Sequence, residues 1–174
     1  MVLQSNIKVK VPFSSYFCFI ANDMERETRD EYYMRSALAE AEKALSKQEV
    51  PVGAVVVCND QIIARAHNLT ETLTDPTAHA EMQVITAAAS HLGGKYLQGC
   101  TVYVTVEPCP MCAAALSWSQ VSSLVYGCDD EKKGYTLIKG QLLHPRTKIR
   151  KGILSEQCSA LMSGFFRSKR TKKV

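Results

Sequence analysis

The 174-residue chain lacks long hydrophobic runs, and no apolar stretch approaches the roughly 20 residues of a membrane-spanning helix. Internal repeats and low-complexity segments are also missing. Its seven cysteines, an odd number, show no disulfide framework, which indicates a reducing, cytosolic compartment. Hydrophobic residues make up 46% of the chain and charged residues 22%, as in an ordinary globular domain with a sizeable core. The net charge of +4 permits a polyanionic partner but does not require one.

What the sequence does contain is a split group of metal-binding residue types. The segment H-A-E at 79–81 is followed, about thirty residues later, by E-P-C-P-M-C at 107–112. One imidazole, from His79, and two thiolates, from Cys109 and Cys112, suit Zn²⁺ and fill three of its four tetrahedral positions. A fourth protein ligand is not evident, and an open position distinguishes a catalytic zinc from a structural one.

Glu81 favours a catalytic interpretation of this site. It lies two residues from His79, where a carboxylate is needed to carry protons for a zinc-bound water. The combined order H-x-E…P-C-x-x-C is the signature of zinc-dependent deaminases. Two other interpretations stay open. The two cysteines could form a redox pair, or the zinc could be structural, with a fourth ligand from a group that comprises His67, His91, Cys100 and Cys128.

The first 28 residues differ from the rest of the chain. Lys8 and Lys10 precede a short apolar run at 13–20, which loosely resembles a signal peptide. That run contains two serines, and no clear small-residue cleavage site follows it. We therefore expect residues 1–28 to form a disordered or loosely docked extension, and residues 29–174 to form a zinc-dependent deaminase domain.

Hydrophobic periodicity divides the remaining chain into alternating helices and strands. Amphipathic stripes predict helices at 31–47 with Asp30 as the N-cap, from 77 to about 93, at 109–119 and at 153–168. Short β-branched runs predict strands at 52–57, 62–66, 101–106, 123–126 and around Ile149, with a tight turn at 59–60. This alternation predicts an α/β fold, in which helices cover both faces of a sheet in a three-layer α/β/α sandwich.

The candidate zinc ligands lie at predicted helix starts. The positive end of a helix favours the thiolate forms of Cys109 and Cys112, and their i, i+3 spacing lets both point to one side of the first turn. His79 and Glu81 are spaced i, i+2, which would make them diverge within a helix. The two converge only if His79 sits in the irregular turn before its helix, which is a structural demand of this interpretation.

Five segments carry a wider resemblance. They read EVPVGAVVV at 49–57, TAHAEM at 77–82, YVTVEPC at 103–109, GIL at 152–154 and ALMSGFFR at 160–167. From about residue 30 to residue 170 the chain thereby resembles bacterial tRNA-specific adenosine deaminases, members of the cytidine-deaminase-like superfamily. The resemblance implies a central five-stranded mixed sheet and a cytoplasmic homodimer that binds the tRNA anticodon stem-loop. It implies hydrolytic deamination of the wobble adenosine to inosine by a zinc-bound hydroxide, with Zn²⁺ and no organic cofactor.

The resemblance also implies roles for individual residues of the catalytic site. The zinc ligands fall on His79, Cys109 and Cys112, and the proton shuttle falls on Glu81. Asn68 matches the residue that hydrogen-bonds the purine, and its amide offers both a donor and an acceptor to a base edge. From its position alone, Asn68 is also compatible with an ordinary turn residue after the second predicted strand.

Further matches concern RNA outside the catalytic site. Asp130 and Lys132 match a loop that contacts the anticodon backbone and sugar, although their simplest interpretation is a solvated charged loop. Phe165, Phe166 and Arg167 match a C-terminal RNA-contacting element. Phe165 continues the apolar stripe of its helix and is expected in the core, whereas Phe166 lies at the edge of that stripe, where it could stack on a base.

Two alternative functions remain open. Pro110, directly after Cys109, is a variant shared with guanine deaminases of the same superfamily, so a deaminase of free guanine, another nucleobase or a nucleotide is the first alternative. The C-terminal segment argues against it, and so does the basic tail, which comprises Arg167, Lys169, Arg170, Lys172 and Lys173. A non-enzymatic, zinc-stabilised RNA-binding module is the second alternative, and Glu81 argues against that, because a structural site does not need this carboxylate.

Overall fold

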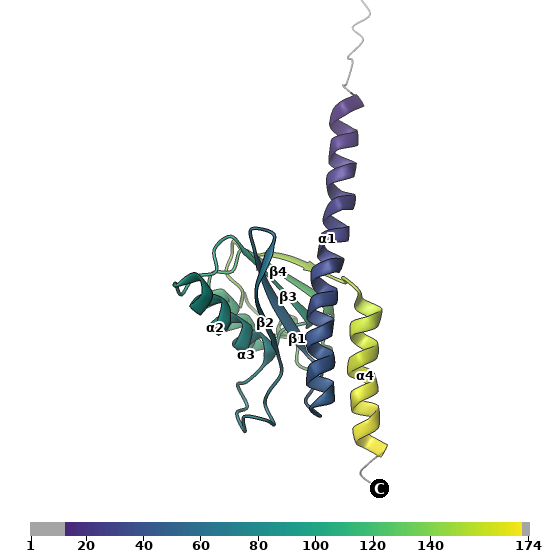
Figure 1. Cartoon of the computed structure of the whole chain (residues 1–174), viewed down its shortest axis with the longest axis vertical. Helices are drawn as coiled ribbons and strands as arrows, with labels where there is room; N and C mark the ends of the chain where they lie inside the picture. Colours follow the sequence, from purple (N-terminus) through teal and green to yellow (C-terminus); the bar gives the residue numbers. More distant parts are fainter. Residues whose placement is uncertain (1–12, 172–174) are drawn as a thin grey trace, which may run out of the picture.

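A computed structural model describes the backbone of residues 13–171 and the side chains of residues 29–170. At its centre is a five-stranded sheet with the strand order β2-β1-β3-β4-β5 (Figure 1). β1 is antiparallel to both of its neighbours, whereas β3, β4 and β5 run parallel, which confirms the expected mixed sheet. The strands are β1 (Gly53–Cys58), β2 (Gln61–His67), β3 (Cys100–Val106), β4 (Ser123–Cys128) and β5 (Lys148–Lys151).

Helices cover both faces of this sheet. α1 (Phe13–Ser46) and α4 (Ser155–Thr171) lie on one face, and α2 (Ala80–Leu92) and α3 (Pro110–Trp118) lie on the other (Figure 1). Alternation along β1 supplies both cores, since Ala54 and Val56 pack with α2 and α3 while Val55 and Val57 pack with α1. The predicted three-layer α/β/α sandwich is therefore confirmed. A short 3-10 helix, η1 (Tyr135–Leu137), lies in the connection between β4 and β5.

The predicted start of the first helix is wrong. α1 begins at Phe13, so Asp30 lies inside the helix and is not its N-cap. The buried Asp30 carboxylate accepts hydrogen bonds from Arg150 at 2.7 and 2.9 Å and from the Tyr103 hydroxyl at 2.6 Å. These bonds satisfy a buried charge and tie α1 to β3 and β5. Residues 1–12 lie outside the described residues, and the division of the chain at residue 28 stays a prediction.

Other predicted boundaries hold to within a few residues. Asn59 and Asp60 form the predicted tight turn, with φ values of 49° and 59°. α2 ends at Gly93, whose left-handed φ of 64° is a conformation that glycine adopts without strain. Leu154 precedes α4 with a φ of 52°, so it lies outside the helix that was predicted to contain it.

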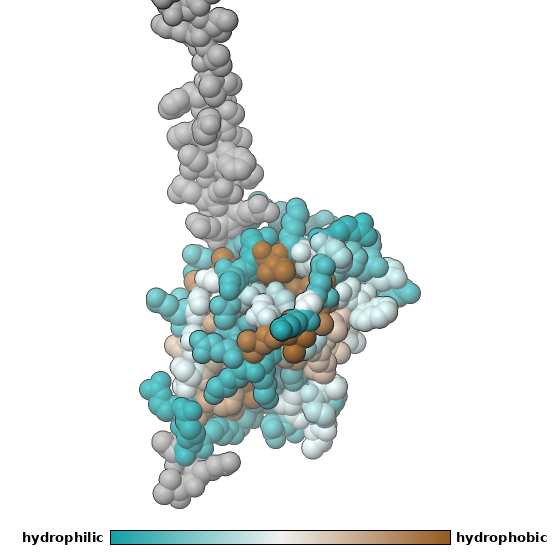
Figure 2. Space-filling view, turned by 180° about the vertical axis from the view of Figure 1, so that it is seen from behind, coloured by the Kyte–Doolittle hydropathy of each residue, from teal (hydrophilic) through white to brown (hydrophobic). Residues whose placement is uncertain are grey.

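The surface of the described chain is mixed in character. Figure 2 shows the molecule from behind, with hydrophobic patches separated by hydrophilic side chains. Among the described residues, no helix combines the length and the apolar character needed to cross a bilayer.

Candidate metal centre and active site

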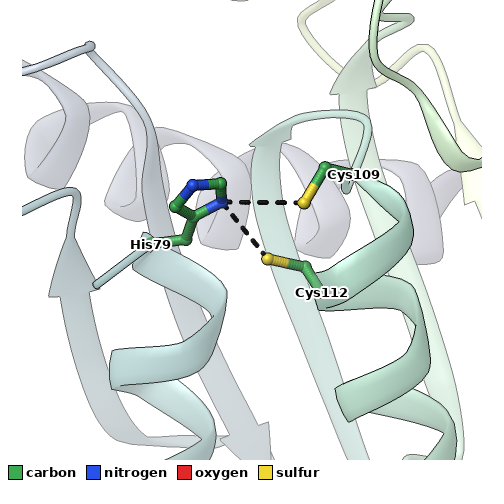
Figure 3. Close-up of side chains that lie close together, drawn as sticks. All are labelled: His79, Cys109 and Cys112. Atoms are coloured by element: carbon green, nitrogen blue, oxygen red, sulfur yellow. Dashed lines mark hydrogen bonds between the residues drawn. The ribbon is translucent and has the colours of Figure 1, made fainter. Parts of the chain in front are cut away.

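Three side chains meet at the N-terminal ends of α2 and α3. The Nδ1 atom of His79 lies 3.7 Å from Cys109 Sγ and 3.4 Å from Cys112 Sγ, and the three atoms lie within 4.8 Å of one another (Figure 3). In tetrahedral zinc sites, Zn–N and Zn–S bonds of about 2.0 and 2.3 Å place a nitrogen and a sulfur ligand about 3.5 Å apart. The spacing and the donor types therefore fit Zn²⁺.

The local backbone places these ligands. His79 is the N-cap of α2 and Cys109 is the N-cap of α3, and both have extended backbones with φ/ψ of −68°/154° and −70°/168°. His79 thus occupies the irregular position before its helix, which the i, i+2 spacing to Glu81 demanded. Pro110 occupies the first turn of α3, where its missing N–H has no intrahelical partner to lose.

The pKa values of the two thiols favour one thiolate at this site even without metal. A hydrogen bond with Cys112, together with a hydrogen bond with His79, lowers the pKa of Cys109 to about 4. The same bond with Cys109, together with burial, raises the pKa of Cys112 above its usual range. One thiolate and one thiol therefore share a proton, which a bound zinc would displace because zinc binds the thiolate form.

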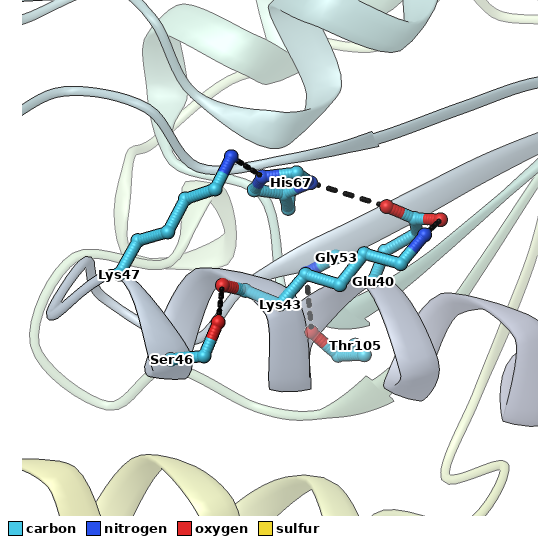
Figure 4. Close-up of polar contacts among 7 residues, drawn as sticks. All are labelled: Glu40, Lys43, Ser46, Lys47, Gly53, His67 and Thr105. Carbon is cyan, nitrogen blue, oxygen red and sulfur yellow. Dashed lines mark hydrogen bonds and ion pairs between the residues drawn. The ribbon is translucent and has the colours of Figure 1, made fainter. Parts of the chain in front are cut away.

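The four residues that were candidates for a fourth zinc ligand do not join the metal-binding group within the described part of the chain. The group that could hold a metal contains His79, Cys109 and Cys112, and none of the four alternative residues joins it. His67 pairs instead with Glu40 through Nδ1 and with Lys47 through Nε2, both at 3.1 Å (Figure 4). The Cys128 thiol lies 3.7 Å from the Thr105 carbonyl oxygen.

Glu81 lies beside the metal-binding group without belonging to it. It sits in the first turn of α2, is 4% exposed, and forms a hydrogen bond with Cys112. Burial raises its pKa to about 6 in the metal-free site. A carboxyl group with a pKa close to neutral, held next to a metal site, is suited to accept and return protons.

Asn68 lies next to the segment that leads to His79. The backbone N–H of Leu69 donates to the carbonyl of Ala78 at 3.0 Å, which holds the end of β2 beside this segment. The Asn68 Nδ2 donates to Glu49 at 3.1 Å and to Thr70 at 2.9 Å. Asn68 is therefore oriented by hydrogen bonds and is more than a free turn residue.

Glu49 is a buried residue beside Asn68 that the sequence interpretation did not single out. Its fully buried carboxylate accepts the amide of Asn68 and also the backbone N–H groups of Glu71 at 3.1 Å and Thr72 at 2.7 Å. One carboxylate thus holds the whole segment after β2. The available signal was an acidic residue directly before a buried strand, which does not reveal what it binds.

The loop after β4 is fixed to the turn that carries Cys109. Asp130 accepts the backbone N–H groups of Lys132 and Lys133 at 3.0 Å each, so its carboxylate closes a turn within the loop. The Tyr135 N–H donates to the carbonyl of Pro108 at 2.9 Å. Lys132 is exposed on this loop.

The C-terminal residues divide between core and surface. Phe165 is 7% exposed, as expected for a core residue, whereas Phe166 is 46% exposed. Their rings are 5.3 Å apart in an edge-to-face arrangement, and Lys169 Nζ lies 5.2 Å from the centre of the Phe165 ring. Arg167 is exposed. The C-terminal end of α4 lies at the same end of the molecule as the loop between β2 and α2, although α4 and α2 cover opposite faces (Figure 1).

A family model and the sequence relatives of this chain agree that it is similar to deaminases. Residues 27–128 match the cytidine and deoxycytidylate deaminase zinc-binding region. The tRNA-specific adenosine deaminase of Bacillus subtilis is 48% identical over 151 residues, which cover 84% of this chain and 94% of that protein. The protein of the same name from Aquifex aeolicus is 43% identical, with 83% and 98% covered.

Solved structures agree with these sequence relatives. A structure from work on A-to-I editing by tRNA:A34 deaminases superimposes with a TM-score of 0.71 at 38% identity, covering 75% of this chain and 98% of that one. A guanine deaminase from Bacillus subtilis gives a TM-score of 0.55 at 36% identity over 57% of this chain and 64% of that one. The chain therefore belongs to the cytidine and deoxycytidylate deaminase zinc-binding family, among the tRNA-specific adenosine deaminases.

Proposed function

We propose that this protein hydrolyses adenosine to inosine at the wobble position of a tRNA anticodon. The observation that carries the proposal is the convergence of His79, Cys109 and Cys112 beside a buried Glu81 that is not part of the ligand group. Relatives named tRNA-specific adenosine deaminase, among them a chloroplastic tRNA(adenine(34)) deaminase of Arabidopsis thaliana at 41% identity, support the choice of substrate.

His79, Cys109 and Cys112 would hold the zinc ion. When bound, Zn²⁺ lowers the pKa of a coordinated water towards about 7, which makes hydroxide available at neutral pH. Glu81 takes one proton from the attacking water and delivers it to N1 of the base. It then carries the second proton from the new C6 hydroxyl to the departing amine. Water and adenosine are consumed, and inosine and ammonia are released.

Recognition of RNA is assigned to three regions of the chain. Asn68 hydrogen-bonds the purine, and Lys132, on the loop that starts at Asp130, contacts the anticodon backbone. Phe166 and Arg167 supply a stacking surface and a positive charge from α4. An unpaired anticodon loop presents its bases without a duplex to open. We also propose that the enzyme acts on tRNA in the cytoplasm.

We also propose that the enzyme works as a homodimer, as the family resemblance implies. Trp118, the only tryptophan of the chain, is 83% exposed at the end of α3 and provides a reporter. Sedimentation and tryptophan fluorescence across a dilution series test this, and a monomer at all concentrations would exclude the dimer.

The decisive substrate test compares an anticodon stem-loop that carries adenosine at the wobble position with free guanine, and detects inosine and ammonia. Robust guanine deamination without reaction on RNA would move the protein to the guanine deaminases, the alternative that Pro110 and the guanine deaminase structure favour.

A second test removes residues 166–174, which deletes Phe166 and the basic tail but keeps the buried Phe165. RNA affinity should fall, and the slope of log affinity against log salt should become shallower by about 0.7–0.9 for each phosphate that the truncated protein no longer binds. Ile149→Ala is the matched control, because Ile149 is 47% exposed but lies on β5. Unchanged RNA deamination after truncation would remove the C-terminal contact from the proposal.

A further inference from the structure

Glu107 is a buried carboxylate placed between two functional segments. It directly follows β3 and begins the turn that leads to Cys109, and it is 4% exposed. Its Oε2 accepts the backbone N–H of Asp130 at 3.0 Å, and its Oε1 accepts the backbone N–H of Thr136 at 3.0 Å. The two oxygens of one side chain therefore hold both ends of the loop 130–136, two residues away from a candidate zinc ligand.

The loop is built around this carboxylate. Gly134 is buried, and a Cβ at this position would overlap the Glu107 carboxyl group. The loop is closed further by the Gly134 N–H, which donates to the carbonyl of Asp130 at 2.9 Å. The φ of Gly134 is −60°, a conformation that any residue can adopt. Glycine is therefore required here because the Glu107 carboxylate approaches so closely, and not because of the backbone conformation.

The same contacts determine what the loop can present to RNA. The Asp130 carboxylate is committed to the turn that contains Lys132 and Lys133, so it faces its own backbone. Both lysines are exposed, and their backbone positions depend on Asp130, which in turn depends on Glu107. The positive charge for an RNA phosphate therefore comes from the two lysines, whose backbone positions Glu107 fixes through Asp130.

We propose that Glu107 is a positioning residue that fixes the lysine-bearing loop relative to the metal centre. This inference rests on the proposed RNA substrate, because the loop needs a fixed place only if it contacts the RNA whose base enters the zinc site. Glu107 acts through Asp130 and Thr136 and does not touch the reacting atoms.

The test uses two variants that attack one contact from opposite sides. Glu107→Gln replaces one acceptor oxygen with a donor, and Gly134→Ala fills the space that the carboxylate occupies. Glu40→Gln is the control for the first, since Glu40 is also 4% exposed but binds Lys43 and His67 on the opposite face of the sheet. Gly94→Ala is the control for the second, because a Cβ at Gly94 meets open space.

The first readout does not involve RNA. Limited trypsin digestion of the full chain, followed by mass spectrometry, measures cleavage after Lys132 and Lys133. Loss of one charge-assisted hydrogen bond should increase loop opening, and hence this cleavage, about 10–100-fold in both test variants and in neither control. Zinc per chain should stay unchanged.

The second readout is steady-state deamination of the anticodon stem-loop, where KM should rise while kcat changes little. Cleavage as slow as in the unaltered chain would overturn the inference, and so would loss of zinc and kcat in both test variants. Faster cleavage with an unchanged KM would overturn the link to RNA. If the unaltered chain does not deaminate RNA at all, the proposed function fails, while the cleavage rates still decide whether Glu107 holds the loop.

Discussion

Replacement of Glu81 by glutamine separates proton transfer in the site from metal binding. Glutamine has nearly the same shape but cannot take up or release protons at neutral pH. General acid–base groups contribute about 10²–10⁴-fold to turnover, so kcat should fall by at least about a hundredfold. The proposed zinc ligands His79, Cys109 and Cys112 are untouched, and zinc content should remain the same.

The same substitution should make the metal-free protein more stable. Burial raises the pKa of Glu81 from 4.5 to about 6, which means that the folded state disfavours the charged carboxylate. The penalty corresponds to ~2 kcal/mol. It is absent below pH 4.5, develops as the pH rises to about 6, and is fully present above that value. Neutral glutamine removes it, so the gain in unfolding free energy should be ~2 kcal/mol at pH 8 and near zero at pH 4.

The assay pairs urea unfolding of chelator-treated protein at pH 4 and pH 8 with deamination by zinc-loaded protein at pH 8. Glu42→Gln, which alters an exposed carboxylate of α1, is the control and should change neither quantity appreciably. Turnover within threefold of the unaltered enzyme would refute the role of Glu81 as proton carrier. A loss of stability at pH 8 would refute the argument from burial.

Three further predictions follow from other contacts. Gly53→Ala places a Cβ against the backbone of α1, and it should lower the unfolding free energy by about 1–3 kcal/mol in urea, while Gly94→Ala should not. Zinc affinity, measured with a competing chelator, should fall as the pH is lowered, because a hydrogen bond with the neighbouring thiolate raises the pKa of His79 and protons compete with metal. Glu49→Gln weakens the acceptor that orients Asn68, so KM for RNA should rise with zinc retained; an unchanged KM would contradict this role.

The sequence was sufficient for the parts of this protein that depend on local spacing. The i, i+3 pair Cys109 and Cys112 follows from the first turn of one helix, and alternation along β1 follows from the pleat. The start of α1 was not predictable from the apolar stripe, because the stripe marks only where the helix packs. Asp30 looked like a cap, but its partner Arg150 lies 120 residues away. Periodicity carries no information about such a pair.

Three buried glutamates show why the remaining roles needed the fold. Glu49 is fully buried, and burial alone would raise its pKa, yet hydrogen bonds from Thr72, Glu71 and Thr70 lower it overall. The Glu107 carboxylate accepts two backbone N–H groups from one loop.

Glu81 differs from Glu49 because its hydrogen bonds do not overcome the effect of burial, and its pKa rises to about 6. Carboxylates that backbone N–H groups hold in the charged form are suited to positioning a segment, because giving up that charge would break those bonds. A carboxyl group poised near neutrality can exchange protons at little cost. Residue type cannot distinguish the two uses. The number and source of the N–H groups that reach each carboxylate distinguish them, and these are set only when segments more than twenty residues apart meet.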